Sequence, residues 1–266
     1  MAAFDIIAAT SHAYKNTWAN RSYILKLAVV PFALRLFFFT LAVSYANGNF
    51  TYFMLLMLPA LFAQGWMLSH YIRFQVLGQS WPFRPTGDMD ADLAVLKTRA
   101  RGVLSCTIVF VLINMGVGML SEGVRLYMLP YMPVEGATEM EVPAHVLLVS
   151  ILLLGFMVWG FRLFWLYIPY ALNMSATAYL SALKGVMISV YLFVVWVICS
   201  LPFIALLAIA ATIIGDPLAA TFGKGVATFV MILFTVAADL AKSVMATSGI
   251  AYALQEIFTN QNKVRL

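Results

Sequence analysis

The sequence predicts an all-α integral membrane protein with six transmembrane helices and short interfacial amphipathic helices. Of its 266 residues, 63% are hydrophobic and only 10% are charged, whereas soluble domains average about 45–50% and about 25%. The mean hydropathy is +0.93. Apolar runs long enough to cross a bilayer recur along the chain, separated by short polar segments. We therefore interpret residues 1–266 as a single six-span membrane domain.

The first predicted element is an interfacial helix over about residues 3–19. Phe4, Ile7, Tyr14 and Trp18 share one broad helical face in this stretch, with the polar residues opposite. Such a helix is expected to lie flat at the lipid headgroups. Residues 1–21 contain no apolar core of the length that a signal peptide needs, so the first span is expected to insert uncleaved.

Six spans follow, separated by turn and loop signals. The AsnGlyAsn sequence at 47–49 marks a reversal between the first two spans, and GlyAspPro at 215–217 a turn between the last two. The aspartates at 88–92 offer N-caps for a short helix that ends near Arg101, ahead of the third span. The spans are expected at about residues 22–45, 50–72, 102–126, 144–170, 186–214 and 226–257.

Most lysines and arginines outside the spans fall on one side of this topology. They occupy the N-terminal stretch, residues 73–101, residues 173–185 and the C-terminal tail, whereas residues 127–143 on the other side carry none. The positive-inside rule then places both termini in the cytoplasm. We expect a multi-pass protein of a bacterial inner (plasma) membrane.

Two stretches carry a resemblance to a known group. Residues 162–172 read RLFWLYIPYAL and are followed by SATAYLSALKG, while residues 13–32 read AYKNTWANRSYILKLAVVPF. The pattern resembles six-span bacterial membrane proteins of the YciC-like type, a group that includes the membrane domain of some glycerophosphodiester phosphodiesterases. The resemblance covers most of the chain and implies a six-helix bundle with interfacial helices. It contains no catalytic motif and implies little about activity.

Charged residues inside the predicted spans are the candidate functional site. An ionisable side chain in hydrocarbon costs roughly 2.5–3.5 kcal/mol unless it is paired or hydrated. Asp239 is the only acidic residue deep in any span, and it shares a helix face with Lys242, three residues on. We expect Asp239 to pair with Arg35 across helices, and Arg162 and Lys242 are its other candidate partners. The candidate intramembrane charge network is Arg35, Arg162, Asp239 and Lys242.

This network has two interpretations at the sequence level. It could hold a dry bundle together, or it could line a polar path for an ion, a proton or an anionic solute. We favour the dry bundle, but access to water decides between the two and the sequence does not show it.

The sequence predicts no enzyme, no catalytic residue, no cofactor and no metal centre. Hydrolase, nucleotide-binding and zinc motifs are missing. Ser181 and Lys184 have the spacing of a Ser–Lys nucleophile, but no oxyanion element accompanies them. The two cysteines, Cys106 and Cys199, lie in apolar runs and are expected to be buried and inert. Basic residues are scattered as ones and twos, so nucleic acid is not an expected partner.

Two functions stay open on this basis. The first is a partner, assembly or membrane-organising factor, favoured by the small loops, which leave no room for a soluble catalytic domain. Its expected partners are the lipid bilayer and a second protein or a second copy of the chain. The alternative is a small-solute or ion transporter that uses the intramembrane charges.

Overall fold

The chain folds into a bundle of long helices. The computed structural model describes residues 4–131 and 143–264, with side chains to residue 259, and these residues contain helices and no strand. Residues 132–142, most of the predicted acidic loop, lie outside the described part. The helices are α1 (Ile6–Ala19), α2 (Arg21–Tyr45), α3 (Phe50–Leu77), α4 (Met89–Met128), η1 (Leu129–Tyr131), α5 (Ala144–Gly160), η2 (Phe161–Trp165), α6 (Tyr167–Ala171), α7 (Ala176–Ala182), α8 (Val186–Ala210), η3 (Ala211–Gly215), α9 (Asp216–Phe222) and α10 (Lys224–Val264).

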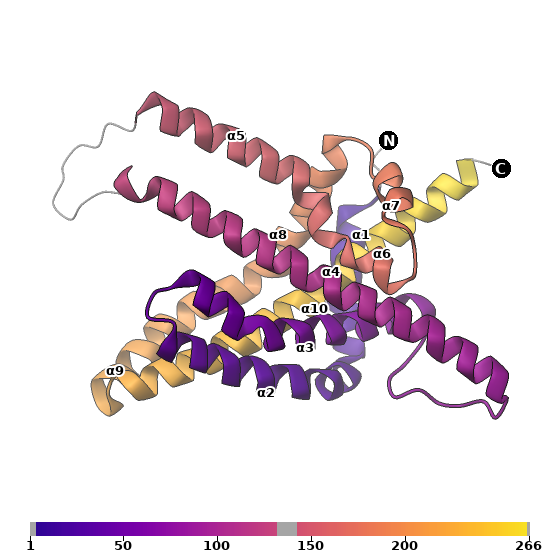
Figure 1. Cartoon of the computed structure of the whole chain (residues 1–266), viewed down its shortest axis with the longest axis horizontal. Coiled ribbons are helices and arrows are strands. Elements are labelled where there is room, and N and C mark those ends of the chain that lie inside the picture. Colours follow the sequence, from indigo (N-terminus) through magenta and orange to yellow (C-terminus); the bar gives the residue numbers. More distant parts are fainter. Residues whose placement is uncertain (1–3, 132–142, 265–266) are drawn as a thin grey trace.

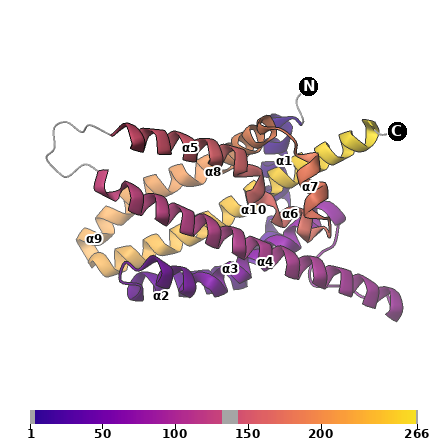
Figure 2. The same ribbon diagram turned by 45° about the horizontal axis from the view of Figure 1, so that its top comes forward.

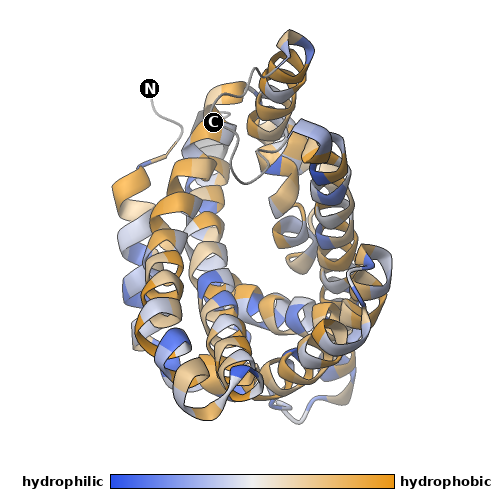
Figure 3. Ribbon diagram, turned by 90° about the vertical axis from the view of Figure 1, so that its left-hand side faces the viewer, coloured by the Kyte–Doolittle hydropathy of each residue, from blue (hydrophilic) through white to orange (hydrophobic). Residues whose placement is uncertain are grey.

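Six helical stretches are long and apolar enough to span a membrane, which confirms the predicted fold class. They cover residues 21–45, 50–77, 89–131, 144–171, 186–222 and 224–259. Hydrophobic positions dominate these stretches (Figure 3). Leu104, Leu152 and Leu201 remain 61%, 63% and 59% exposed on three of them. A protein surface this rich in exposed apolar side chains has lipid as its natural solvent.

The long helices run roughly side by side, with α10 at the centre of the packing. It contacts α1, α2, α3, α8 and α9. Figures 1 and 2 show α1, α7 and the end of α10 at one end of the bundle, and the α2–α3 turn and α9 at the other. At that turn Asn47 and Gly48 have φ of 47° and 76°, which confirms the predicted reversal.

The predicted interfacial helix packs more deeply than a helix lying on the headgroups. Figure 1 shows α1 crossing the direction of the long helices, and it contacts α8 and α10. Ala9 and Ala13 are fully buried, and a Cβ at Gly249 of α10 would lie 3.3 Å from that of Ala13. These small residues let the helices approach closely, while Ile7 and Trp18 stay exposed.

Polar side chains fasten α1 to the bundle. Asn16 donates hydrogen bonds to Tyr71 Oη at 3.2 Å and to Ser248 Oγ at 3.3 Å. His12 stacks on Tyr252 with ring centroids 4.4 Å apart, and burial lowers the pKa of His12 below its ordinary value. The neutral imidazole is therefore the form that this packing favours.

A proline in α8 adds a further link to α1. Pro202 lies inside the helix and has no N–H, so the carbonyl of Ile198, four residues earlier, loses its helical hydrogen bond. The Tyr14 hydroxyl donates to this carbonyl at 3.0 Å. Lipid around the helix offers no substitute donor, and such freed backbone groups are met by neighbouring helices.

Two predicted boundaries are wrong for identifiable reasons. The short helix ahead of the third span is instead the start of α4, because nothing between Asp88 and Gly102 ends a helix. Asp88 does cap it, accepting from Asp90 N at 3.1 Å. Gly102 is where α4 approaches α6 most closely, since a Cβ there would lie 2.8 Å from the Ala171 carbonyl oxygen.

The turn predicted at residues 215–217 is helical. Gly215 has φ of −62°, and Pro217 lies in the first turn of α9, where a missing N–H is harmless. The chain reverses later, at Gly223, whose φ is 87°. The fourth span covers residues 144–171, close to the predicted bounds, but it is not one continuous α-helix, because α5 ends at Gly160 and a 3₁₀ segment follows it. The polar tail continues α10 to Val264.

Removing the Tyr14 hydroxyl tests the link between α1 and α8. We expect Tyr14→Phe to lower the free energy of unfolding by about 1 kcal/mol, because the Ile198 carbonyl is left unpaired. In a Pro202→Ala background the restored N–H supplies that hydrogen bond, so the same substitution should have little effect. A double-mutant cycle by SDS titration in mixed micelles measures the difference. Equal losses in the two backgrounds would contradict this interpretation.

Candidate functional site

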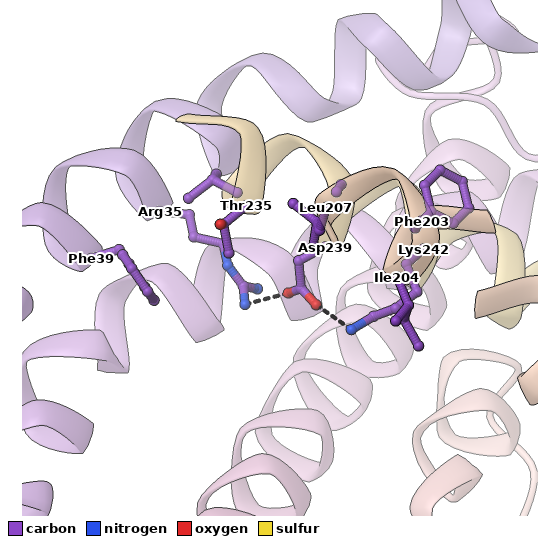
Figure 4. Close-up of a pocket in the computed structure, with 10 residues that line it drawn as sticks. Arg35, Phe39, Phe203, Ile204, Leu207, Thr235, Asp239 and Lys242 are labelled. Atoms are coloured by element: carbon purple, nitrogen blue, oxygen red, sulfur yellow. Dashed lines mark ion pairs between the residues drawn. The ribbon is translucent and has the colours of Figure 1, made fainter. Parts of the chain in front are cut away.

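The candidate site is a three-residue charge cluster, Arg35, Asp239 and Lys242, near the middle of the bundle. Arg35 projects from α2 and forms an ion pair through Nη2 with Asp239 Oδ2 of α10. Lys242 Nζ lies 2.5 Å from the other carboxylate oxygen, Oδ1. Figure 4 shows both cations directed at the one carboxylate. The expected contact of Arg35 and Asp239 across helices is thus present.

Two polar side chains extend the cluster into a closed ring. Arg35 Nη1 donates to Gln64 Oε1 of α3. Gln64 Nε2 donates to Ser243 Oγ at 2.9 Å, and Ser243 Oγ donates to the backbone carbonyl of Asp239 at 2.7 Å. The ring joins α2, α3 and α10, three helices that pack against one another. Each charged group therefore has its partners within the bundle.

Helix geometry explains the placement of these side chains. Asp239, Lys242 and Ser243 lie three and four residues apart, which puts them on one face of α10. Arg35 and Gln64 lie near the middle of α2 and α3, which form a hairpin through the 46–49 turn. The hairpin sets the two residues at similar depth, opposite that face of α10.

Arg162, the fourth predicted member, lies apart from the cluster. It follows α5 in the 3₁₀ segment, where its Nη1 donates to the Leu183 carbonyl at 2.5 Å. Its guanidinium also lies 5.1 Å from the ring centroid of Trp159. Arg162 therefore anchors the end of α7 by a carbonyl contact and takes no part in neutralising Asp239.

The cluster borders open space on two sides. A cavity of about 250 Å³ lies against α2, α8 and α10 and is lined by all three charged residues together with apolar side chains including Phe203 and Leu207 (Figure 4). The side chains of Arg35, Asp239 and Lys242 remain 15%, 22% and 31% exposed. The charged side chains are therefore not completely enclosed by protein atoms.

The second cavity is larger and mainly apolar, with seven aromatic residues in its lining. It measures about 610 Å³ and also reaches all three charged residues. Its remaining polar lining is Gln64, Asn114 and Ser243, with the Tyr167 ring among the aromatic side chains. The other lining residues are Leu68, Phe110, Ile113, Val117, Leu154, Met157, Val158, Phe161, Phe164, Trp165, Phe193, Trp196 and Ala246.

Sequence reasoning missed the ring members Gln64 and Ser243 and the aromatic wall. Gln64 is an amide in the middle of an apolar span, a signal that could have added it to the network. Ser243 gives little signal, because serines are common in membrane helices. Phe161, Phe164 and Trp165 lie in the 3₁₀ segment after α5 and line the larger cavity.

The cluster can bind charge but has little means of breaking bonds. It has two cations for one carboxylate, and the serine at its edge is engaged with Gln64 and a backbone carbonyl. Among the described residues, no three His, Cys, Asp or Glu side chains gather as a metal site requires. The arrangement suits recognition of an anion beside an apolar surface.

Removing the carboxylate tests how strongly the cluster stabilises the fold. We expect Asp239→Asn to lower the free energy of unfolding by about 3 kcal/mol, because two cations then lack a partner. The free energy of unfolding of the double variant Arg35→Met/Asp239→Leu should fall by less than that of Asp239→Asn, since the double variant removes both members of a pair. Glu122→Gln, which breaks the exposed 2.6 Å pair with Arg125, is the control and should have no measurable effect. A double variant as unstable as the sum of its single variants would contradict the pairing.

Comparison with known proteins leaves the family open. No family model, no curated protein and no solved structure matches the chain. The resemblance to YciC-like proteins therefore stays a prediction from residues 13–32 and 162–185. The function has to be argued from the geometry of the charge cluster and its two cavities.

Proposed function

We propose that the protein is a transporter whose intramembrane site binds a small amphiphile with an anionic group. The observation that carries this proposal is the joint lining of both cavities by Arg35, Asp239 and Lys242. Charges that served only to hold helices together would need no space beside them. Here the space is large enough for a ligand, since binding pockets commonly measure about 300–1,000 Å³.

The sign of the ligand follows from the formal charges of the cluster. Asp239 satisfies one cation, which leaves the cluster with an excess of one positive charge in surroundings where charge is poorly screened. Lys242 is the most exposed of the three at 31%, so its ammonium is the group best placed to meet an anion. The aromatic wall of the larger cavity would hold the apolar body of the same ligand.

One observation favours the partner-binding function that the sequence also predicts. Figures 1 and 2 show the beginning of α4 projecting from the bundle. Met89, Leu93 and Leu96 lie on one face of this segment and are 86%, 64% and 41% exposed. An exposed apolar stripe on a projecting helix end would suit a protein partner.

Ligand binding at the cluster is tested with a matched pair of brominated amphiphiles. 12-Bromododecane-1-sulfonate carries a permanent anion, whereas 12-bromododecan-1-ol does not, and bromine quenches tryptophan on contact. We expect the sulfonate to quench the cavity residues Trp165 and Trp196 at lower concentration than the alcohol. Lys242→Gln should weaken binding of the sulfonate about tenfold, the equivalent of roughly 1.4 kcal/mol. Binding of the alcohol should be unchanged. Lys224→Gln, an exposed lysine of the same helix, is the control.

Two outcomes of this measurement would refute the anion site. One is equal quenching by sulfonate and alcohol in the wild-type protein. The other is an identical sulfonate curve for Lys242→Gln. Loss of affinity in the Lys224→Gln control would show that general surface charge, and not the cluster, attracts the sulfonate.

Transport itself is tested in phosphatidylcholine vesicles with a dodecanesulfonate that carries a nitrobenzoxadiazole label. Dithionite bleaches only label in the outer leaflet, so protein-mediated movement raises the bleached fraction above about one half. We expect the wild-type protein to raise it, and Asp239→Asn to abolish the rise because the cluster is disrupted. Glu122→Gln is the control. No rise with the wild-type protein, together with crosslinking of a partner from position 93 in intact membranes, would favour the partner-binding function instead.

A further inference from the structure

A third cavity, which is lined mainly by polar and basic residues, lies at the end of the bundle that carries α1 and α7. It measures about 660 Å³ and is bordered by α4 on one side and by the segment from α6 to α7 on the other. Its floor is held by close contacts between these elements. Asn173 donates to the Thr98 carbonyl at 3.1 Å, and Gly102 allows α4 to approach Ala171.

The charge of this cavity is entirely positive. Lys97 and Arg101, one turn apart on α4, both line it, and no acidic residue does. Within residues 4–131 and 143–259 the ion pairs are Arg35–Asp239, Lys242–Asp239 and Arg125–Glu122, so neither cation has a carboxylate partner there. The nearest acid along α4, Asp92, lies five residues before Lys97 and accepts from Thr86 N.

The rest of the lining is rich in hydroxyl groups. Ser105, Ser175 and Thr177 border the cavity, together with the Tyr170 ring. Ser175 Oγ accepts from Ala178 N and from Thr177 Oγ1, which leaves its own hydroxyl proton free to be donated. Two cations and several hydroxyl donors in a cavity without a carboxylate are the chemistry that recognises a phosphate group.

The position of the cavity beside lipid completes the argument. Leu104 and Ile108 follow Arg101 on α4 and are 61% and 42% exposed. The exposed apolar surface therefore begins within one turn of Arg101. A phosphate held by Lys97 and Arg101 would lie at the depth of a lipid headgroup, with its acyl chains along α4.

We propose that this cavity, bordered by Lys97, Arg101, Ser175 and Thr177, is a phosphate-binding site that is separate from the intramembrane charge cluster. Its ligand is the phosphate of an anionic phospholipid or of a soluble phosphate compound. The two sources share the same recognition chemistry and differ in whether acyl chains contribute to affinity. This site does not depend on the transport proposed above.

The test uses the full chain and two double variants that remove equal charge from the same end of the bundle. Lys97→Gln/Arg101→Gln removes both cations of the cavity, and Lys15→Gln/Arg84→Gln removes two exposed cations outside it. Native mass spectrometry measures binding of dioleoyl phosphatidylglycerol and of dioleoyl phosphatidylcholine. Equilibrium dialysis measures binding of inorganic phosphate to the protein in phosphatidylcholine nanodiscs.

We expect the wild-type protein to bind phosphatidylglycerol more tightly than phosphatidylcholine. The Lys97→Gln/Arg101→Gln variant should bind phosphatidylglycerol at least about tenfold more weakly than the wild-type protein. Each basic residue near a membrane surface contributes about 1 kcal/mol to the binding of an anionic lipid. The Lys15/Arg84 control should lose no more than about twofold, because its charges lie outside the site. Loss of inorganic phosphate binding in the cavity variant alone would identify a soluble phosphate as the ligand.

Two outcomes would overturn the proposal. One is the same loss of phosphatidylglycerol affinity in both double variants, which would show attraction by general surface charge. The other is no loss of lipid or phosphate binding in the cavity variant. Unchanged melting temperatures of both variants, measured in the same samples, exclude misfolding as the cause of a loss.

Discussion

The bundle depends on ion pairs that neutralise the charged side chains in the middle of its membrane-spanning helices. A guanidinium in the hydrocarbon region needs a partner supplied by the protein, and Arg35 obtains one from Asp239 on a helix far away in the sequence. Gln64 and Ser243 then complete a ring that fixes how α2, α3 and α10 face one another. Members of the same ring line both cavities beside the cluster.

Three other arginines of the bundle bind backbone carbonyl groups in place of a carboxylate. Arg73 is 1% exposed and donates to the Ala171 carbonyl at 2.5 Å, at the end of α6. Arg99 is 5% exposed and donates to the Ser80 carbonyl at 2.6 Å, and Arg162 donates to that of Leu183. Carbonyls at helix ends lack intrahelical partners and carry partial negative charge. Arg73 and Arg162 thus anchor the ends of the short helices α6 and α7, whereas Arg99 holds the loop after α3. Only Arg35 among these arginines takes a carboxylate.

The sequence was sufficient for the parts of the structure that depend on composition and on scarce residues. Six apolar runs predict six spans, and a lone deep acid predicts a partner for Arg35. The sequence did not predict the parts of the structure in which helix packing overrides a local turn or helix signal. Gly215 and Pro217 look like a turn, but both fit a helix at the positions that they occupy. Arg162 looked available to Asp239 until the 3₁₀ segment after Gly160 turned it toward α7. Each cavity depends on side chains from three or more helices, so no pattern along the chain reveals them.

The pairing of Arg35 with Asp239 also has a consequence for how the chain is made. Arg35 enters the membrane with the first span, whereas Asp239 belongs to the last. Throughout synthesis of the intervening helices the guanidinium is without its carboxylate, and it must be hydrated or held near the membrane surface until α10 arrives. Insertion of the final span is therefore the event that completes the bundle. A chain truncated before α10 lacks Asp239, so its Arg35 has no carboxylate partner and the bundle cannot close around it.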